Sequence, residues 1–435
     1  MIRGTARYVL WVMVAINVLN YADRWVGSVV APLVQSEFRL NDLQVGLLGS
    51  AFIVVYALAA LPFGYWADRG VRKVVIGVGV TIWSLATVAS AFVGNFAQLF
   101  VARAVLGVGE ASYYPAGTSL LSDSFPKEQR PRAMAIWDAG TAVGIAIGFA
   151  GGGAIAGAFG WRAAFLCTAV PGLILAVLAF TMREPLRGAA ERLGPKVEHL
   201  REAGWGGYKR LIKIPTLRAT ILARTSLYFV LAAAAFWLPT LLGRRFGMTV
   251  GQAGLFSGVV LVLGGLTGTL LGAFLVGWFR RRGRNGDVTS LWVGIAGFLI
   301  GAVCMVVALA GPWSVGVVPV FIPSFFIAVA GLYLYSGPFD AVGQNVVSPG
   351  LRASAVTLQL LVAHLLGDSY STAAVGAISD GLHSLMAALL VTCPPLLVLS
   401  AIFAATALPY VRRDTARMED EWAQRDALEP DLAPE

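Results

Sequence analysis

The chain has 435 residues, of which 57% are hydrophobic and only 13% are charged. Soluble domains carry charge on about 25% of their residues, so this composition excludes a soluble globular protein. Apolar runs of about 20 residues, the length of a helix that spans a bilayer, recur along the whole chain. The composition therefore predicts an all-α membrane protein that crosses the bilayer many times.

The formal net charge of +9 comes from Lys and Arg residues that lie mainly between the apolar runs. Such residues mark the cytoplasmic loops of membrane proteins, so the charge does not indicate a nucleic-acid partner. Cys167, Cys304 and Cys393 lie within apolar runs and lack the spacing of a metal site or a disulfide framework. We therefore expect no metal and no cofactor. The first apolar run is too long for a cleavable signal peptide.

Turn-forming segments such as SEFRLND at 36–42 and SFPKEQRPR at 124–132 divide the apolar sequence into twelve predicted membrane spans. In chain order, the predicted spans cover residues 8–32, 44–67, 74–94, 97–121, 132–157, 160–182, 217–242, 251–279, 288–310, 314–337, 351–377 and 383–409.

The longest polar stretch separates six spans from six. We therefore expect an N-terminal six-helix bundle at 1–182, a cytoplasmic linker at 183–216 and a C-terminal six-helix bundle at 217–410. The segment 411–435 is polar and acidic, which predicts a disordered cytoplasmic tail.

Lys and Arg residues concentrate in alternate loops, which sets the orientation. The loops that would lie outside hold Arg39, Arg162, Arg244 and Arg245, whereas the loops on the other side hold most of the remaining cations. The positive-inside rule therefore predicts that both termini are cytoplasmic.

The two halves of the chain resemble each other. GYWADRGVR at 64–72 corresponds to GWFRRRGRN at 277–285, and RAMAI at 132–136 corresponds to RASAV at 352–356. Two related helical bundles are typical of transporters that rock one half against the other around a site near the membrane midplane.

The first span contains a charged pair, Asp23–Arg24, within NYADRW at 20–25. Ionisable residues in a span mark function by default. Adjacent helical residues point about 100° apart, so one or both must find partners on other helices or in a water-filled cavity. The alternative is a buried ion pair that only fixes packing.

Arg103 and Glu110 are seven residues apart in the fourth span, close to two full turns, and so share one helix face. Glu110 lies roughly 20 Å from the outer end, near the midplane. Arg24 is its natural cation. A carboxylate so placed can bind a proton from one side and release it to the other. The alternative is that Glu110 only neutralises an arginine.

HLLGD places His364 and Asp368 one turn apart in the eleventh span, which favours a polar site. Arg224 is close enough to the cytoplasmic end of the seventh span to snorkel into water. Tyr113 and Tyr114 either line a cavity or pack in the core. The same choice applies to Tyr333 and Tyr335.

The short loop GYWADRGVRK at 64–73 indicates a cytoplasmic gate. We expect Gly64 to allow close helix approach and Gly70 a tight turn, while Asp123 supplies a counter-charge and the start of the eleventh span supplies a positive helix end for Asp68. The predicted gate residues are Gly64, Asp68, Arg69, Gly70, Arg72, Lys73 and Asp123.

GYWADRGVRK, RAVLGVGEA at 103–111 and the glycine-rich GTAVGIAIGFAGGG at 140–153 resemble signatures of the major facilitator superfamily. NYADR, the long segment from GEASYYPAG to RAMAI, and HLLGD resemble the Spinster-like lipid transporters within it. The resemblance implies proton-linked transport of lysophospholipids or sphingoid phosphates by alternating access.

Carried over by motif, Asp23, Arg24 and Glu110 would be the proton-coupling residues, with His364 and Asp368 facing them. The predicted substrate-binding residues are Asn20, Arg24, Arg103, Glu110, Tyr113, Tyr114, His364 and Asp368. The proton gradient would replace any cofactor. We expect a multi-pass monomer in the inner (plasma) membrane.

An alternative prediction keeps the same transport mechanism but changes the substrate. NYxDR and a span-four EAxxxPA pattern also occur in anion:cation symporters, which implies proton-driven uptake of a small organic anion such as a sugar acid. A membrane-embedded enzyme is not indicated, because the sequence has neither HExxH nor GxSxG.

Overall fold

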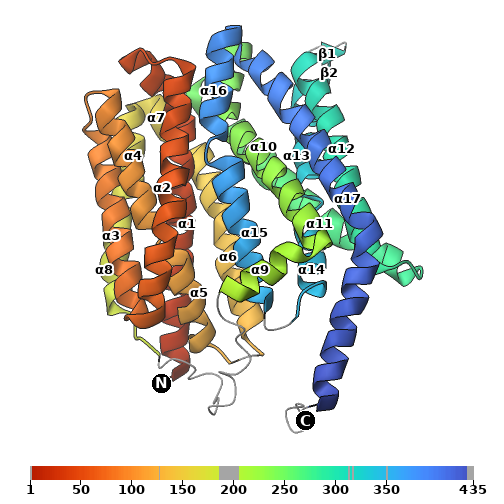
Figure 1. Cartoon of the computed structure of the whole chain (residues 1–435). Coiled ribbons are helices and arrows are strands. Elements are labelled where there is room, and N and C mark those ends of the chain that lie inside the picture. The colour runs from red at the N-terminus through yellow and green to blue at the C-terminus, as the bar shows by residue number, and fades with distance from the viewer. Residues whose placement is uncertain are drawn as a thin grey trace. The chain divides into compact units, whose positions relative to one another are not determined.

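The computed structural model describes residues 2–126, 128–185, 205–311, 314–315, 318–348 and 351–428 (Figure 1). Within these ranges the chain is helical apart from short connections and one antiparallel ribbon, in which β1 (Ser314–Val315) pairs with β2 (Val318–Pro319).

Short connections join most of the helices along the chain. The first part of the chain forms α1 (Ile2–Phe38), α2 (Asp42–Arg69), α3 (Arg72–Ala91), α4 (Phe96–Glu110), α5 (Tyr113–Ser124), α6 (Arg130–Ala146), η1 (Ile147–Gly151), α7 (Gly152–Phe159) and α8 (Trp161–Thr181). The rest forms α9 (Trp205–Lys213), α10 (Pro215–Phe246), α11 (Val250–Arg281), α12 (Gly286–Ala310), α13 (Phe321–Tyr333), α14 (Ser336–Asn345), α15 (Arg352–Ala363), η4 (His364–Asp368), α16 (Ser371–Leu382) and α17 (Leu385–Leu428).

Each predicted span coincides with one helix or with consecutive helical segments. Four spans are interrupted: α4 and α5 share one, as do α13 and α14, while the π-helical turns η1 and η4 interrupt two others. Nine helical stretches in the described ranges are long and apolar enough to cross a membrane. The chain is therefore a multi-pass, all-α membrane protein, as its composition predicts.

The predicted start of the tenth span at residue 314 is wrong. Residues there form the β1–β2 ribbon, and helix begins only at Phe321. Val318 precedes Pro319, and the proline ring disfavours helical backbone at the residue before it.

The predicted tail also differs from the structure. Helix α17 continues from the last span through residue 411 to Leu428. The Asp414 carboxylate accepts hydrogen bonds from the backbone N–H (3.1 Å) and hydroxyl (2.7 Å) of Thr216, which ties α17 to the start of α10. Residues 429–435, like 186–204 of the predicted linker, lie outside the described residues.

The chain divides into two compact units. Unit 1 comprises Met1–Gly194, Ala232–Val262 and Ser369–Ala388, and unit 2 comprises Pro195–Leu231, Leu263–Asp368 and Leu389–Glu435. Unit 1 therefore combines the first six spans with parts of α10, α11 and α17 and with α16. The two predicted six-helix bundles stay a prediction.

In unit 1, helices α2 and α16 are in backbone contact. A Cβ at Gly376 would lie 2.3 Å from the carbonyl oxygen of Asp42, and one at Gly46 would lie 2.2 Å from that of Thr372. The Thr372 hydroxyl donates to the Gly46 carbonyl at 2.7 Å. Small residues and hydroxyl hydrogen bonds are the usual means by which helices associate in lipid.

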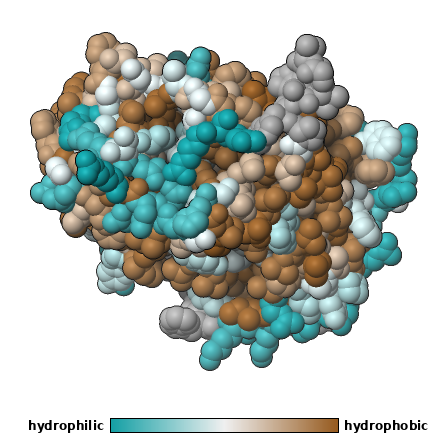
Figure 2. All heavy atoms as spheres, turned by 90° about the horizontal axis from the view of Figure 1, so that it is seen from above, coloured by the Kyte–Doolittle hydropathy of each residue, from teal (hydrophilic) through white to brown (hydrophobic). Residues whose placement is uncertain are grey.

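The N-terminal end of α2 is the centre of a charged network within unit 1. Asp42 accepts hydrogen bonds from Gln35 (2.7 Å), Arg244 (2.8 Å) and Ser379 (2.5 Å), and Asp380 caps the helix by accepting the N–H groups of Asp42 and Leu43, each at 2.9 Å. The network borders a cavity of about 530 Å³. Figure 2, the view from above, shows hydrophilic residues gathered among hydrophobic ones on that face. The network therefore fixes α1, α2, α10 and α16 together at their predicted outer ends.

The contact between α2 and α16 can be tested with two glycines of the same helix. Gly376→Ala forces the two backbones apart, and overpacking of this kind costs about 1–3 kcal/mol. We expect a lower apparent melting temperature for the detergent-solubilised protein. Gly381→Ala is the control, because nothing lies within 4 Å of its new Cβ in the described residues. Equal melting temperatures for the two variants would contradict the contact.

Candidate functional site

Arg24 and Glu110 form an ion pair inside unit 1. Arg24 donates to Oε2 of Glu110 from Nη2 at 2.9 Å and from Nε at 3.3 Å. The Glu110 side chain is fully buried, and that of Arg24 is 23% exposed. The Arg24 guanidinium also lies 4.9 Å from the ring centroid of Phe52 and 5.2 Å from that of Tyr56. The predicted pairing is confirmed, and aromatic faces add to the stabilisation of the cation.

Asp23 points to a different set of helices. Its carboxylate accepts hydrogen bonds from the hydroxyl groups of Thr87 on α3 (2.5 Å) and Thr168 on α8 (3.0 Å), and it is 1% exposed. The two adjacent charges of NYADRW thus find partners on separate helices, as their 100° separation requires. Asp23 has hydroxyl donors of its own, whereas Glu110 depends on Arg24.

Glu110 stands where the fourth span is interrupted. It is the last residue of α4, and a turn at Ala111 and Ser112 separates it from α5. Its Oε2 bonds Arg24, but its Oε1 is buried without a hydrogen-bond partner among the described residues. One oxygen of this carboxylate is therefore held by the cation, while the other is available to a proton.

Arg103 lies close to this pair without bonding to it. It interacts electrostatically with Asp23 and Glu110, and its guanidinium lies 5.5 Å from the Phe52 ring centroid. A Cβ at Gly27 would come within 2.9 Å of Nη2, so the guanidinium packs directly against this glycine. A narrow cavity of about 20 Å³ adjoins the side chain.

Three other predicted binding residues have distinct surroundings in unit 1. Asn20 is fully buried, and neither of its amide atoms has a hydrogen-bond partner in the described part of the chain. Tyr113 is buried and donates to Asn17 Oδ1 at 2.6 Å. Tyr114 is 45% exposed and stacks on Trp137 at 5.2 Å. Tyr113 is therefore a core residue with a satisfied hydroxyl.

Sequence reasoning missed several residues of this site. Thr87, Thr168, Asn17 and Phe52 all contact the charged residues or the tyrosines. Asn17 lies one turn before Asn20 in the same apolar run, a signal that could have identified it. The threonines gave no such signal, because threonine is common in membrane helices.

Unit 2 contains a second polar cluster. His364 Nδ1 and Asp368 Oδ2 are 2.8 Å apart, which confirms the one-turn pairing predicted from HLLGD. These residues form the π-helical turn η4, a feature often found at functional sites. The Tyr228 ring of α10 meets the His364 ring edge-on at 5.3 Å. The predicted facing of His364 and Asp368 toward the Arg24 site stays a prediction.

The expectation that Arg224 snorkels into water is wrong. Its side chain is 4% exposed and donates from Nη2 to Asp340 Oδ1 at 2.5 Å. The guanidinium lies 5.5 Å from the Tyr335 ring centroid. Asp340, on α14, is a further functional candidate that the sequence reasoning did not single out.

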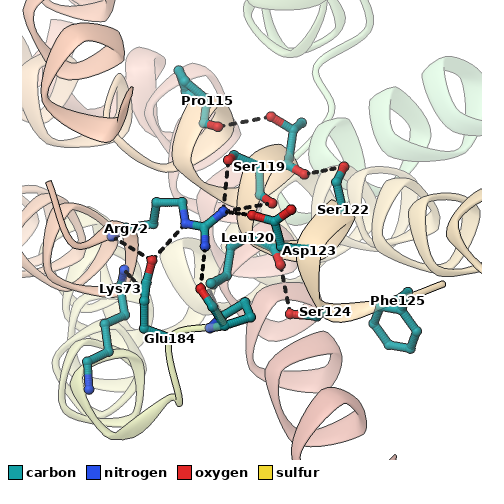
Figure 3. Close-up of polar contacts among 12 residues, drawn as sticks. Arg72, Lys73, Pro115, Ser119, Leu120, Ser122, Asp123, Ser124, Phe125 and Glu184 are labelled. Carbon is teal, nitrogen blue, oxygen red and sulfur yellow. Dashed lines mark hydrogen bonds and ion pairs between the residues drawn. The ribbon is translucent and has the colours of Figure 1, made fainter. Parts of the chain in front are cut away.

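The predicted gate loop forms a network around Arg72 (Figure 3). Arg72 is fully buried, pairs with Asp123, and donates to Glu184 at 2.7 Å, to Ser119 Oγ at 3.0 Å and to the Pro185 carbonyl at 2.8 Å. The Glu184 carboxylate also accepts the first N–H groups of α3. Asp123 thus supplies the predicted counter-charge to the loop, specifically to Arg72, and Glu184 is an unpredicted partner.

The other gate residues contribute less to this network. Asp68 and Arg69 are exposed, with the Arg69 guanidinium 4.1 Å from the Tyr65 ring centroid. No described atom lies within 4 Å of the Cβ position at Gly64, so the predicted close helix approach is not found. Gly70 is needed because a Cβ would lie 2.7 Å from the Trp66 ring. The contact of Asp68 with the start of the eleventh span stays a prediction.

Comparison with known proteins identifies the relatives of this chain. A model of the Major Facilitator Superfamily matches residues 13–372. The chain is 33% identical over 384 residues to Protein spinster homolog 1 of Xenopus laevis, covering 84% of this chain and 71% of the relative. Identity to Protein spinster homolog 1 of Homo sapiens is 29% over 402 residues, covering 87% and 74%.

Solved structures of known proteins match the fold of this chain. A crystal structure of a bacterial homolog to the human lysosomal transporter Spinster, inward-facing and unoccupied, matches with a TM-score of 0.80 and 26% identity, covering 96% of this chain and 98% of that chain. A D-xylose–proton symporter, at 14% identity and a TM-score of 0.74, has the same fold.

The Arg72 network predicts a large difference between two adjacent cations. Arg72→Gln leaves Asp123 and Glu184 without their cation, and breaking a buried ion pair costs up to about 3–5 kcal/mol. We expect a marked fall in the apparent melting temperature. Lys73→Gln is the control, because the Lys73 side chain extends away from the network (Figure 3) and only its backbone N–H bonds Glu184. The network would be dispensable if both variants melted like the wild type.

Proposed function

Because the chain belongs to the Spinster family of major facilitator superfamily transporters, we propose that it is a proton-coupled transporter of an anionic lipid with a single tail, a lysophospholipid or a sphingoid phosphate. It would work by alternating access in the inner (plasma) membrane as a monomer. The observation that carries the proposal is the Arg24–Glu110 pair, in which a partly exposed cation holds a fully buried carboxylate.

The pair couples charge on the substrate to a proton. A carboxylate buried in a membrane helix is strongly disfavoured once its cation is taken away. If a phosphate or carboxylate group of the substrate binds Arg24, Glu110 must therefore take up a proton, and Oε1 is the atom without a partner in the described residues. When the substrate leaves, Arg24 returns to Glu110 and the proton is released. Substrate anion and proton thus bind together, and the net charge of the site stays constant.

Asp23 and Arg103 keep their charges unchanged during this exchange. The hydroxyl groups of Thr87 and Thr168 stabilise the Asp23 carboxylate, whose charge in turn offsets that of Arg103. Asp23 is a proton-coupling candidate as well. A proton on Asp23, however, would neutralise its carboxylate and leave Arg103 without its nearby anion. We therefore assign the exchanging proton to Glu110 and a supporting role to Asp23.

The choice of a lipid as cargo rests on the Spinster-like motifs NYADR and HLLGD together with the family membership. The chemistry of the Arg24–Glu110 pair serves any phosphate or carboxylate, including a small organic anion such as a sugar acid. The functional test therefore has to compare both classes of substrate.

Flux into proteoliposomes under an imposed pH gradient, with a lysophospholipid panel beside a sugar-acid panel, tests this function. We expect gradient-driven movement of lysophospholipids in the wild type. Glu110→Gln cannot exchange a proton and should lower that flux at least about tenfold, equivalent to about 1.4 kcal/mol. Glu37→Gln is the matched control, since Glu37 lies beyond the predicted end of the first span and pairs with Arg162 at an exposed site.

Two other flux results would contradict parts of this proposal. Movement of sugar acids alone would transfer the same residues to a small-anion symporter. Lysophospholipid flux that responds to the gradient equally in Glu110→Gln and wild type would contradict the proton role of Glu110.

A further inference from the structure

The internal repeat relates the first span to the seventh and the fourth to the tenth. In unit 1, Arg24 on the first span pairs with Glu110 on the fourth. In unit 2, Arg224 on the seventh span pairs with Asp340 on the tenth. Both carboxylate-bearing spans are interrupted by a two-residue turn, at 111–112 and at 334–335. Each half therefore contains one arginine–carboxylate pair on corresponding helices.

The two pairs differ in how the arginine is used. Nε and Nη2 form one edge of the guanidinium, and Arg24 directs both at Glu110. Arg224 bonds Asp340 through Nη2 alone, and its Nε has no hydrogen-bond partner in the described ranges. A phosphate or carboxylate that used both donors of this edge would bind Arg224 more completely than Asp340 does.

The exposure of the arginine and carboxylate side chains also differs between the two pairs. Arg224 is 4% exposed, so it needs an acceptor wherever Asp340 goes. Asp340 is 50% exposed, so it can turn into water at little cost when another anion takes its place. The pair in unit 2 therefore combines a fixed, buried cation with a carboxylate that is easily displaced.

Further polar groups surround Arg224 within unit 2. Tyr228 lies one turn further along α10, interacts electrostatically with Arg224 and contacts the His364 ring. Gly367 allows η4 to approach α10 closely, because a Cβ there would lie 2.6 Å from the Thr225 carbonyl oxygen. The close approach brings the imidazole of HLLGD to the helix that carries Arg224.

We propose that Arg224, with Tyr228 and His364 beside it, is a second anion-binding site, at which a phosphate or carboxylate group displaces Asp340. The proposal rests on the proposed function in one respect: the anion is the headgroup of the transported molecule. Binding at Arg224 needs no proton on a carboxylate, because Asp340 keeps its charge in water. The site in unit 2 thus binds the headgroup without a proton, whereas an anion that binds Arg24 in unit 1 brings a proton to Glu110.

Butyl phosphate, a soluble monoester, is a suitable probe, and the readout is the apparent melting temperature of the protein in nanodiscs. A ligand that binds the native state stabilises it by RT ln(1 + [L]/Kd), so its Kd follows from how the melting temperature rises with ligand concentration. We expect concentration-dependent stabilisation of the wild type, with an apparent Kd about tenfold lower in Asp340→Asn, where the competing carboxylate is gone. Arg224→Gln should reduce the stabilisation to what binding at Arg24 provides.

Two further variants make the result decisive. The double variant Arg224→Gln/Asp340→Asn leaves no unpaired charge, so it should fold like the wild type and still show only the reduced response of Arg224→Gln. Arg218→Gln removes an exposed arginine of the same helix and should respond as the wild type does. Absence of stabilisation in the wild type, a response in Arg224→Gln equal to that of the wild type, or an unchanged apparent Kd in Asp340→Asn would overturn the site.

The measurement separates this site from the proposed function, because it uses neither a gradient nor a lipid. Stabilisation that depends on Arg224 would stand even if lysophospholipid flux were absent. Stabilisation that is lost in Arg24→Gln but kept in Arg224→Gln would overturn the second site while leaving the proton-coupled exchange at Arg24 in place.

Discussion

The ion pair between Arg24 and Glu110 is the interaction on which the functional arrangement of unit 1 depends. A fully buried carboxylate near the middle of a membrane span needs hydrogen-bond donors or a cation, and Glu110 has Arg24 at 2.9 Å. The surroundings follow from that need. Phe52 and Tyr56 present their rings to the guanidinium, and α4 ends at Glu110 so that the carboxylate projects from a helix terminus. The same arrangement makes the carboxylate sensitive to any anion that competes for Arg24.

Other charged networks hold the scaffold around this pair. Arg72 joins α3, α5 and the segment after α8 through Asp123 and Glu184, all inside unit 1. Asp42 joins α1, α2, α10 and α16 at the opposite ends of the helices, where glycines bring α2 and α16 into backbone contact. Buried or partly buried pairs of this kind add little net stability over apolar packing, but they penalise any arrangement that leaves a charge alone. They therefore favour one specific helix arrangement in unit 1.

Much of this could be predicted from the sequence, because the membrane restricts what a charge can do. Asp23, Arg24, Glu110, His364 and Asp368 stood out as ionisable residues in apolar runs, and the structure confirms the pairs Arg24–Glu110 and His364–Asp368. The helical spacing of four residues was enough for the second pair. Most helix boundaries followed turn residues. The exceptions are the start of the tenth span, where Val318 before Pro319 favours extended chain, and the end of α17, which continues past residue 409.

The errors have physical reasons too. Arg224 was expected to reach water because it lies near a span end, and its true partner, Asp340, comes from a helix distant in sequence. Thr87 and Thr168 gave no signal, because a threonine that serves a buried carboxylate looks like any other threonine in a membrane helix. The cytoplasmic tail was expected to be disordered from its charge, but the hydrogen bonds of Asp414 to Thr216 extend α17 beyond the last span. Long-range contacts of this kind are not encoded in local pattern.

The central claim is that Glu110 takes up a proton when an anion binds Arg24. Infrared difference spectroscopy of the protein in lipid, recorded as lysophosphatidate is added, reports this event directly. If the exchange occurs, the carbonyl stretch of a protonated carboxyl group appears on binding in the wild type and in Glu37→Gln and is missing in Glu110→Gln. If the band does not appear in the wild type, or persists in Glu110→Gln, the proton is not carried by Glu110.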